Sequence, residues 1–167
     1  MTDAYLWTID HGIVEWDAYW HSYLSKASKC QNPKDNKKTR FYNKGANEEE
    51  NVTNEFLKAR LAQQPVGAAF YSDLKCMDFY KNGVMMASDC NKDCSNPNKK
   101  EVNHAVTIVG YGISDRKDCS EYWLIKNSWG NAWGIDGHFK FCADRKTSWE
   151  QAYGGCQIAS FIMWPSL

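Results

Sequence analysis

A series of short apolar runs separated by glycines, in the last two-thirds of the chain, restricts the fold most strongly. The clearest run, Ala105 to Tyr111, is rich in β-branched residues and predicts a strand. Four further runs also predict strands, over residues 66–71, 122–126, 137–141 and 157–163. Short strands punctuated by glycine favour an antiparallel sheet or an open barrel.

The first part of the chain has a different pattern and predicts helices. Residues 3–11 predict a short helix that Thr2 or Asp3 can cap and that Gly12 can end. Residues 54–64 predict a second helix, which Pro65 ends. The polar residues 31–50 predict an exposed loop or a weak strand, and the Cys-, Asn- and Lys-rich residues 73–101 predict a long cross-linked loop. The fold class expected from these elements is therefore α+β.

Composition excludes several classes of function. The 167 residues carry 20 basic and 20 acidic side chains, so the formal net charge is zero. No basic stretch follows a phosphate backbone and no apolar run could span a bilayer, so we expect no nucleic-acid partner and no membrane partner. Residues 1–20 lack the basic start and apolar run of a signal peptide. We therefore expect either that the chain stays in the cytosol or that its true N-terminus lies upstream of Met1.

Seven cysteines favour an oxidising compartment, because such a density is unusual in a cytosolic protein. They occupy positions 30, 76, 90, 94, 119, 142 and 156. Cys90 and Cys94 have three residues between them, but no second pair with zinc-ligand spacing follows them. We expect disulfides, with at least one cysteine left without an internal partner by the odd count. We expect neither a metal site nor a cofactor.

Two segments carry a recognisable pattern. The first is Val102 to Gly112, Val-Asn-His-Ala-Val-Thr-Ile-Val-Gly-Tyr-Gly, and the second is Tyr122 to Gly130, Tyr-Trp-Leu-Ile-Lys-Asn-Ser-Trp-Gly. In order and spacing they resemble the His and Asn motifs of papain-like cysteine peptidases, the cathepsins among them. The resemblance implies a papain-like fold, with residues 1–30 as a remnant of its helical left lobe and residues 31–167 as its sheet-rich right lobe.

The resemblance also implies roles for the residues of these motifs. In this family a cysteine thiolate attacks the peptide bond, and a neighbouring imidazole lowers its pKa and later protonates the leaving amine. His104 would be that acid and base, and Asn127 would orient its ring. Trp129 would cover the hydrogen bond between them, with Ser128 supporting the site. A lone histidine before an apolar strand is more often a capped or core residue, but the second motif at the family spacing favours the catalytic position.

The nucleophile of the family falls outside this sequence. It precedes the histidine by about 130–150 residues, which places it before Met1. The resemblance assigns Cys94, with Cys90 as its rival, to a disulfide with Cys156. We expect the nucleophile to come from upstream sequence or from a second chain, which would also cover residues 3–11, and we expect the chain alone to be inactive. The alternative is a catalytically inactive relative that acts as a structural or binding component.

Substrate preference is implied by positions that line the family's S2 pocket. Ala69, Val102 and Ala105 would line it and Ser160 would form its floor, so small side chains here favour a bulky hydrophobic P2 residue in a peptide or protein substrate. The family suggests lysosomal or secreted residence.

One further motif is independent of the family. Asn51-Val52-Thr53 has the pattern of an N-glycosylation acceptor, and the alternative is a polar helix start.

Overall fold

The structure is a computed structural model that describes residues 1–15, 26, 39–90 and 93–166. The chain contains both helices and strands, with three consecutive strands in its second half, which confirms the mixed α+β prediction. In chain order the elements are α1 (Thr2–His11), β1 (Gly45–Glu50), α2 (Asn54–Leu61), β2 (Val66–Phe70), α3 (Lys75–Asp78), β3 (Val84–Met85), α4 (Ala87–Cys90), β4 (His104–Ile113), β5 (Glu121–Lys126), β6 (His138–Cys142), α5 (Ser148–Tyr153), η2 (Gly155–Gln157) and β7 (Phe161–Ser166).

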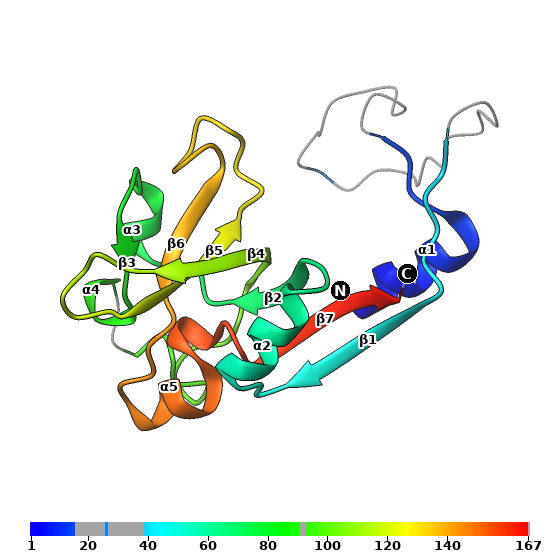
Figure 1. The fold of residues 1–167 in the computed structure, drawn as a ribbon. Coiled ribbons are helices and arrows are strands. Elements are labelled where there is room, and N and C mark those ends of the chain that lie inside the picture. Colours follow the sequence, from blue (N-terminus) through cyan, green and yellow to red (C-terminus); the bar gives the residue numbers. More distant parts are fainter. Residues whose placement is uncertain (16–25, 27–38, 91–92, 167) are drawn as a thin grey trace. The chain divides into compact units, whose positions relative to one another are not determined.

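The strands form one open sheet of seven strands in the order β1-β7-β2-β4-β5-β6-β3 (Figure 1). The central pairs β2–β4, β4–β5 and β5–β6 are antiparallel, as predicted. The two-residue β3 pairs parallel to β6, which the sequence did not indicate. The antiparallel order places the start of β4 and the end of β5 at the same end of the sheet, where both sequence motifs meet.

The core follows the alternation that a half-buried strand requires. In β5, Trp123 is 1% exposed and Ile125 is fully buried. Their register partners on β6 are Phe141 and Phe139, which are also fully buried. All five residues of β2 are buried, so this strand is covered on both faces.

The chain divides into two compact units. The first comprises Glu48–Trp164 together with Met1, and the second comprises Thr2–Asn47 with Pro165–Leu167. In the second unit α1 has no buried residue, and Leu6 and Trp7 are 47% and 42% exposed. Both sequence motifs lie wholly in the first unit. No helix in the part of the chain that the structure describes is long and apolar enough to cross a membrane.

The last strand begins later than predicted. Residues 157–163 were expected to be extended, but β7 starts at Phe161, and Gly155–Gln157 forms a 3-10 turn instead. Cys156 and Gln157 have φ values of +46° and +65°, which a strand does not allow. Side-chain bonds hold this turn, since Cys156 is disulfide-bonded and the Gln157 amide donates to the carbonyl oxygens of Cys94 and Lys100.

Other differences from prediction are local. Helix α2 ends at Leu61 rather than at residue 64, because Pro65 disfavours helical geometry before it and the chain turns through residues 62–64. Residues 45–50 form strand β1, the second of the two possibilities that the sequence left open. The expected loop over residues 73–101 contains three short elements, α3, β3 and α4.

Three disulfides join cysteines of the first unit, which confirms the expectation of disulfide bonds. The pairs are Cys76–Cys90, Cys94–Cys156 and Cys119–Cys142. Cys94 rather than Cys90 is therefore the partner of Cys156. The seventh cysteine, Cys30, lies outside the described residues.

A charged network ties α4 to the turn before β5. The Arg116 guanidinium donates to both carboxylate oxygens of Asp89, to the Asp118 carboxylate and to the Val84 carbonyl oxygen. Hydrogen bonding to Arg116 lowers the pKa of the Asp89 carboxyl, and the Met86 N–H adds to the effect. The stabilisation from Asp89 is therefore complete above the ordinary aspartate pKa and is lost as pH falls through the lower pKa of the folded state.

We predict that Asp89→Asn lowers the free energy of unfolding by about 0.5–1 kcal/mol at pH 7, a modest value because solvent screens this pair. The difference from wild type should shrink as pH falls below about 4. Urea unfolding at pH 7 and at acid pH measures it, with Asp78→Asn as the control, since Asp78 is exposed and pairs with no described cation. A difference that stays constant with pH would contradict the assignment.

Candidate active site

His104 and Asn127 meet at one end of the sheet. His104 is the first residue of β4, and Asn127 follows the last residue of β5. Because Thr107 on β4 pairs with Lys126 on β5, the antiparallel strands bring these two positions together. The ring Nε2 of His104 lies 2.8 Å from Oδ1 of Asn127.

A second hydrogen bond fixes the direction of the first. The backbone N–H of Ser128 donates to Oδ1 of Asn127 over 2.8 Å. An N–H group can only donate, so the shared acceptor is the amide oxygen and Nε2 of His104 carries the proton that it donates. No hydrogen bond joins Nδ1 of His104 to any residue that the structure describes. The ring therefore presents Nδ1 as the atom free to exchange a proton.

The hydrogen bond is sheltered from water on the asparagine side, while the His104 ring is half-buried. Asn127 is only 7% exposed, and its Nδ2 is buried without a hydrogen-bond partner among the described residues. The Trp129 ring lies 5.6 Å from the His104 ring, tilted by 38°. Such shelter strengthens a hydrogen bond because the local dielectric is low.

Trp133 holds Trp129 in this position, a role that neither sequence motif indicated. The two rings meet edge to face at 5.0 Å. Trp133 packs in turn on Tyr80 and Phe139, and its indole N–H donates to the Met77 carbonyl oxygen over 2.9 Å. The Trp-x-x-x-Trp spacing of Trp129 and Trp133, which begins in the second motif and ends just after it, was the signal that could have indicated the contact.

Glycine is required at one point of the loop that carries these tryptophans. Gly134 has a φ of +61°, and a Cβ there would lie 2.4 Å from the His138 carbonyl oxygen. Asn127 is anchored from the other side of the loop, because its N–H donates to the Gly137 carbonyl oxygen over 2.9 Å. The loop thus returns to the start of β6 directly beside Asn127.

Two of the four residues assigned to the S2 pocket are paired in the sheet. Ala69 and Ala105 are register partners on β2 and β4, so these small side chains lie side by side. Ala69 is buried and Ala105 is exposed, while Val102 is half-buried just before β4. Ser160 is 4% exposed and precedes β7, and its Oγ has no hydrogen-bond partner among the described residues. No hydrogen bond among the described residues ties Val102 or Ser160 to the alanine pair.

None of the six described cysteines can act as the nucleophile, because each is disulfide-bonded. Among the described residues, the cluster with metal-ligand proximity is Cys119, Cys142 and Asp144, and both of its cysteines belong to one disulfide. No described sulfur is therefore available as a nucleophile for the histidine and asparagine.

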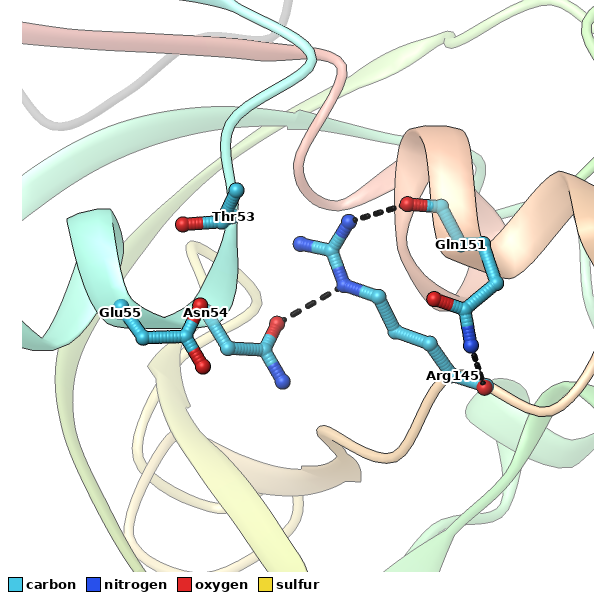
Figure 2. Close-up of a pocket in the computed structure, with 5 residues that line it drawn as sticks. All are labelled: Thr53, Asn54, Glu55, Arg145 and Gln151. Carbon is cyan, nitrogen blue, oxygen red and sulfur yellow. Dashed lines mark hydrogen bonds between the residues drawn. The ribbon is translucent and has the colours of Figure 1, made fainter.

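A polar pocket of about 290 Å³ lies elsewhere in the first unit, lined by Thr53, Asn54, Glu55, Arg145 and Gln151 (Figure 2). Figure 2 shows the Arg145 guanidinium reaching between Asn54 and the main chain of Gln151. It donates to Asn54 Oδ1 over 2.9 Å, to the Gln151 carbonyl oxygen over 2.8 Å and to the Val52 carbonyl oxygen over 2.6 Å. Burial lowers the pKa of Arg145, and the nearby Glu55 carboxylate opposes that effect. This pocket is thus a structural junction between the start of α2 and the end of α5.

The family described as Papain family cysteine protease matches residues 1–166. The chain belongs to this family. The match confirms the resemblance of the two motifs, and both His104 and Asn127 lie within the matched range.

Curated relatives include cathepsins. Procathepsin L of Felis catus is 34% identical over 115 residues, which cover 68% of this chain and 30% of that protein. Cathepsin S of Mus musculus is 31% identical over 170 residues, which cover 100% of this chain and 43% of that protein. This chain therefore spans less than half the length of these curated papain-family relatives.

Solved structures share the fold. The Amb a 11 cysteine protease, a major ragweed pollen allergen, in its proform matches with a TM-score of 0.77 at 29% identity, over 100% of this chain and 45% of that one. The bromelain protease from Ananas comosus matches with a TM-score of 0.73 at 25% identity, over 99% of this chain and 68% of that one. The papain-like fold predicted from the sequence is confirmed.

We predict that Arg145→Met destabilises the protein by about 1–2 kcal/mol, because three carbonyl-type acceptors lose a charge-assisted donor in a half-buried setting. Arg145→Lys should retain only part of the stability, since a lysine cannot present the same planar fork. Denaturant unfolding measures both variants. Lys75→Met, at an exposed lysine, is the control, and equal midpoints for Arg145→Met and wild type would contradict the structural role.

Proposed function

We propose that this chain supplies the histidine and asparagine of a papain-like cysteine endopeptidase. The observation that carries the proposal is the hydrogen bond of 2.8 Å between His104 Nε2 and Asn127 Oδ1, in a chain of this family. This bond leaves Nδ1 as the free nitrogen of the ring, as proton exchange with a thiol requires.

The proposed mechanism assigns each proton to an atom. His104 Nδ1 takes the proton of a cysteine thiol, and the thiolate attacks the carbonyl carbon of the peptide bond. The imidazolium then gives its Nδ1 proton to the leaving amine, so the carbon–nitrogen bond breaks and an acyl-thioester remains. A water molecule hydrolyses the thioester with His104 as base. Throughout, Asn127 keeps the ring in one orientation, and Trp129 limits the access of water to the bond between them.

The thiol would come from upstream sequence or from another chain. All six described cysteines are disulfide-bonded, and the chain spans under half the length of the curated relatives it matches. The same missing portion would cover residues 3–11, where Leu6 and Trp7 are exposed. An apolar pocket of about 300 Å³ in the second unit offers further surface to cover, lined in part by Tyr5, Ile13 and Phe41. In this proposal residues 1–30 belong to the left lobe and residues 31–167 to the right lobe.

The proposed substrates are peptides or proteins. The small side chains of Ala69, Val102 and Ala105, with Ser160 as a floor, would accept a bulky hydrophobic P2 residue. We place the protein in the lysosome or outside the cell, by likeness to the cathepsins and because three disulfides suit an oxidising compartment.

A catalytically inactive relative is the second candidate function. The observation that favours it is that no described cysteine retains a free thiol. In that case the chain would serve as a structural or binding component, and the His104–Asn127 pair would remain as an inherited hydrogen bond.

For the complete protein, isolated from its source or expressed from its full gene, we predict peptidase activity that a thiol alkylator abolishes. His104→Ala should lower kcat/KM by about 10³-fold or more, since it removes both thiol activation and the acid. Asn127→Ala should cause a smaller loss, because the ring remains but is no longer held. Steady-state hydrolysis of peptides with a hydrophobic P2 residue measures these effects.

His138→Ala is the matched control, because His138 lies on β6 and its Nδ1 bonds only the Asp136 carbonyl oxygen among the described residues. It should leave kcat/KM within a few-fold of wild type. Full activity in His104→Ala would contradict the peptidase assignment. A complete, folded protein without activity would establish the inactive alternative.

A further inference from the structure

Asn51 lies in the turn between the end of β1 and the start of α2, and the proposed peptidase mechanism gives its side chain no role. We propose that Asn51 is a site of N-linked glycosylation. It is the first residue of the acceptor pattern Asn51-Val52-Thr53, in which the third residue is threonine and the second is not proline.

The turn presents the Asn51 side chain to solvent. Asn51 is exposed, and its side chain makes no hydrogen bond with any described residue. Its backbone is anchored, because the Asn51 N–H donates to the Ser160 carbonyl oxygen over 3.1 Å. The φ of +52° turns the chain sharply at this residue. The backbone of Asn51 is therefore held in place, while its side-chain amide makes no hydrogen bond with any described residue.

The three residues of the pattern alternate between surface and core. Val52 is 4% exposed, and its N–H donates to the Ala159 carbonyl oxygen over 3.0 Å. Thr53, like Asn51, is exposed. Asn51 and Thr53, the two residues that a glycosyltransferase recognises, are thus exposed. Val52, which it does not recognise, is buried in the core. A sugar on Asn51 would displace nothing in the core.

The alternative explanation, a polar helix start, accounts for only half of the pattern. Thr53 is the N-cap of α2, because its Oγ accepts from the Phe56 N–H over 3.2 Å. The Thr53 side chain also hydrogen-bonds to the Glu55 carboxylate, so both contacts of its hydroxyl group lie at the start of α2. Asn51 caps nothing, and its left-handed φ would be met equally well by glycine. Helix capping therefore explains Thr53 but leaves the side chain of Asn51 without a role.

The modification is a group transfer from a lipid-linked oligosaccharide diphosphate. The Asn51 amide nitrogen bonds to the anomeric carbon of the first sugar, and the bond from that carbon to the diphosphate oxygen breaks. The lipid diphosphate leaves and the amide nitrogen loses one proton. The glycan would stand at the end of β1, an edge strand that already carries the exposed carboxylates of Glu48, Glu49 and Glu50. Charge and bulk on an edge strand both hinder pairing with other chains.

The test is a peptide map of the protein from its natural source. Cleavage after Lys44 and Lys58 releases residues 45–58, which contain Asn47, Asn51 and Asn54. Amidase removal of N-glycans in heavy-oxygen water should convert Asn51 alone into labelled aspartate. Asn47 and Asn54 are internal controls, because neither is followed two residues later by serine or threonine. An unlabelled Asn51 in this peptide would overturn the proposal.

Variants expressed from the full gene in secretory eukaryotic cells distinguish the loss of the sugar from a change in the turn. Asn51→Gly should abolish the glycosidase-sensitive shift in gel mobility while it preserves the left-handed backbone. Thr53→Ala should also abolish the shift, whereas Thr53→Ser should keep both the shift and the helix cap. Because the sugar is added as the chain enters the secretory pathway, the shift is readable even if a variant folds poorly. A shift in Asn51→Gly of the same size as in wild type, or no shift in wild type, would refute the site. Neither result depends on peptidase activity, so the two proposals fail separately.

Discussion

The antiparallel pairing of β4 with β5 is the constraint on which the candidate site depends. It brings the first residue of one strand and the residue after the other to the same end of the sheet, and the hydrogen bond between His104 and Asn127 follows. Side chains alternate with a period of two, so a slip of one residue would turn the buried residues of β5 to the opposite face. Burial of Trp123 and Ile125 against β6 makes such a slip costly, and the core thereby sets the geometry of the site.

The surroundings of the histidine form successive layers of support. Trp129 lies against the ring, Trp133 holds Trp129, and the carbonyl oxygen of Met77 holds Trp133. Met77 follows Cys76, whose disulfide to Cys90 joins α3 to α4. Packed rings, a hydrogen bond and a disulfide thus support the proposed site, which suits a base that must present one nitrogen in a fixed direction.

Much of this arrangement was predictable from the sequence, and the reasons for the failures are physical. The strands β2, β4, β5 and β6 follow local apolar patterns, and His104 and Asn127 stand in two motifs with family spacing. The strand expected over residues 157–163 was partly wrong because long-range bonds from Cys156 and Gln157 impose a turn that no local pattern encodes. The role of Trp133 also depends on tertiary contacts.

One disulfide can be explained by the pairing of neighbouring strands, whereas another depends on contacts that no local pattern encodes. Cys119 lies two residues before β5 and Cys142 is the last residue of β6, so the antiparallel pairing of these strands brings the two cysteines together. The choice between Cys90 and Cys94 for Cys156 had no such local basis. It depends on the folds of α3 and α4, which bring Cys76 to Cys90.

The measurement that tests the central claim most directly is an experimental structure of the complete protein from its natural source. The distance of interest runs from Nδ1 of His104 to the nearest cysteine sulfur. We predict a thiol sulfur within about 4 Å of Nδ1, donated by a cysteine other than the six that form disulfides here. A complete, folded protein in which no thiol from any chain reaches His104 would contradict the account.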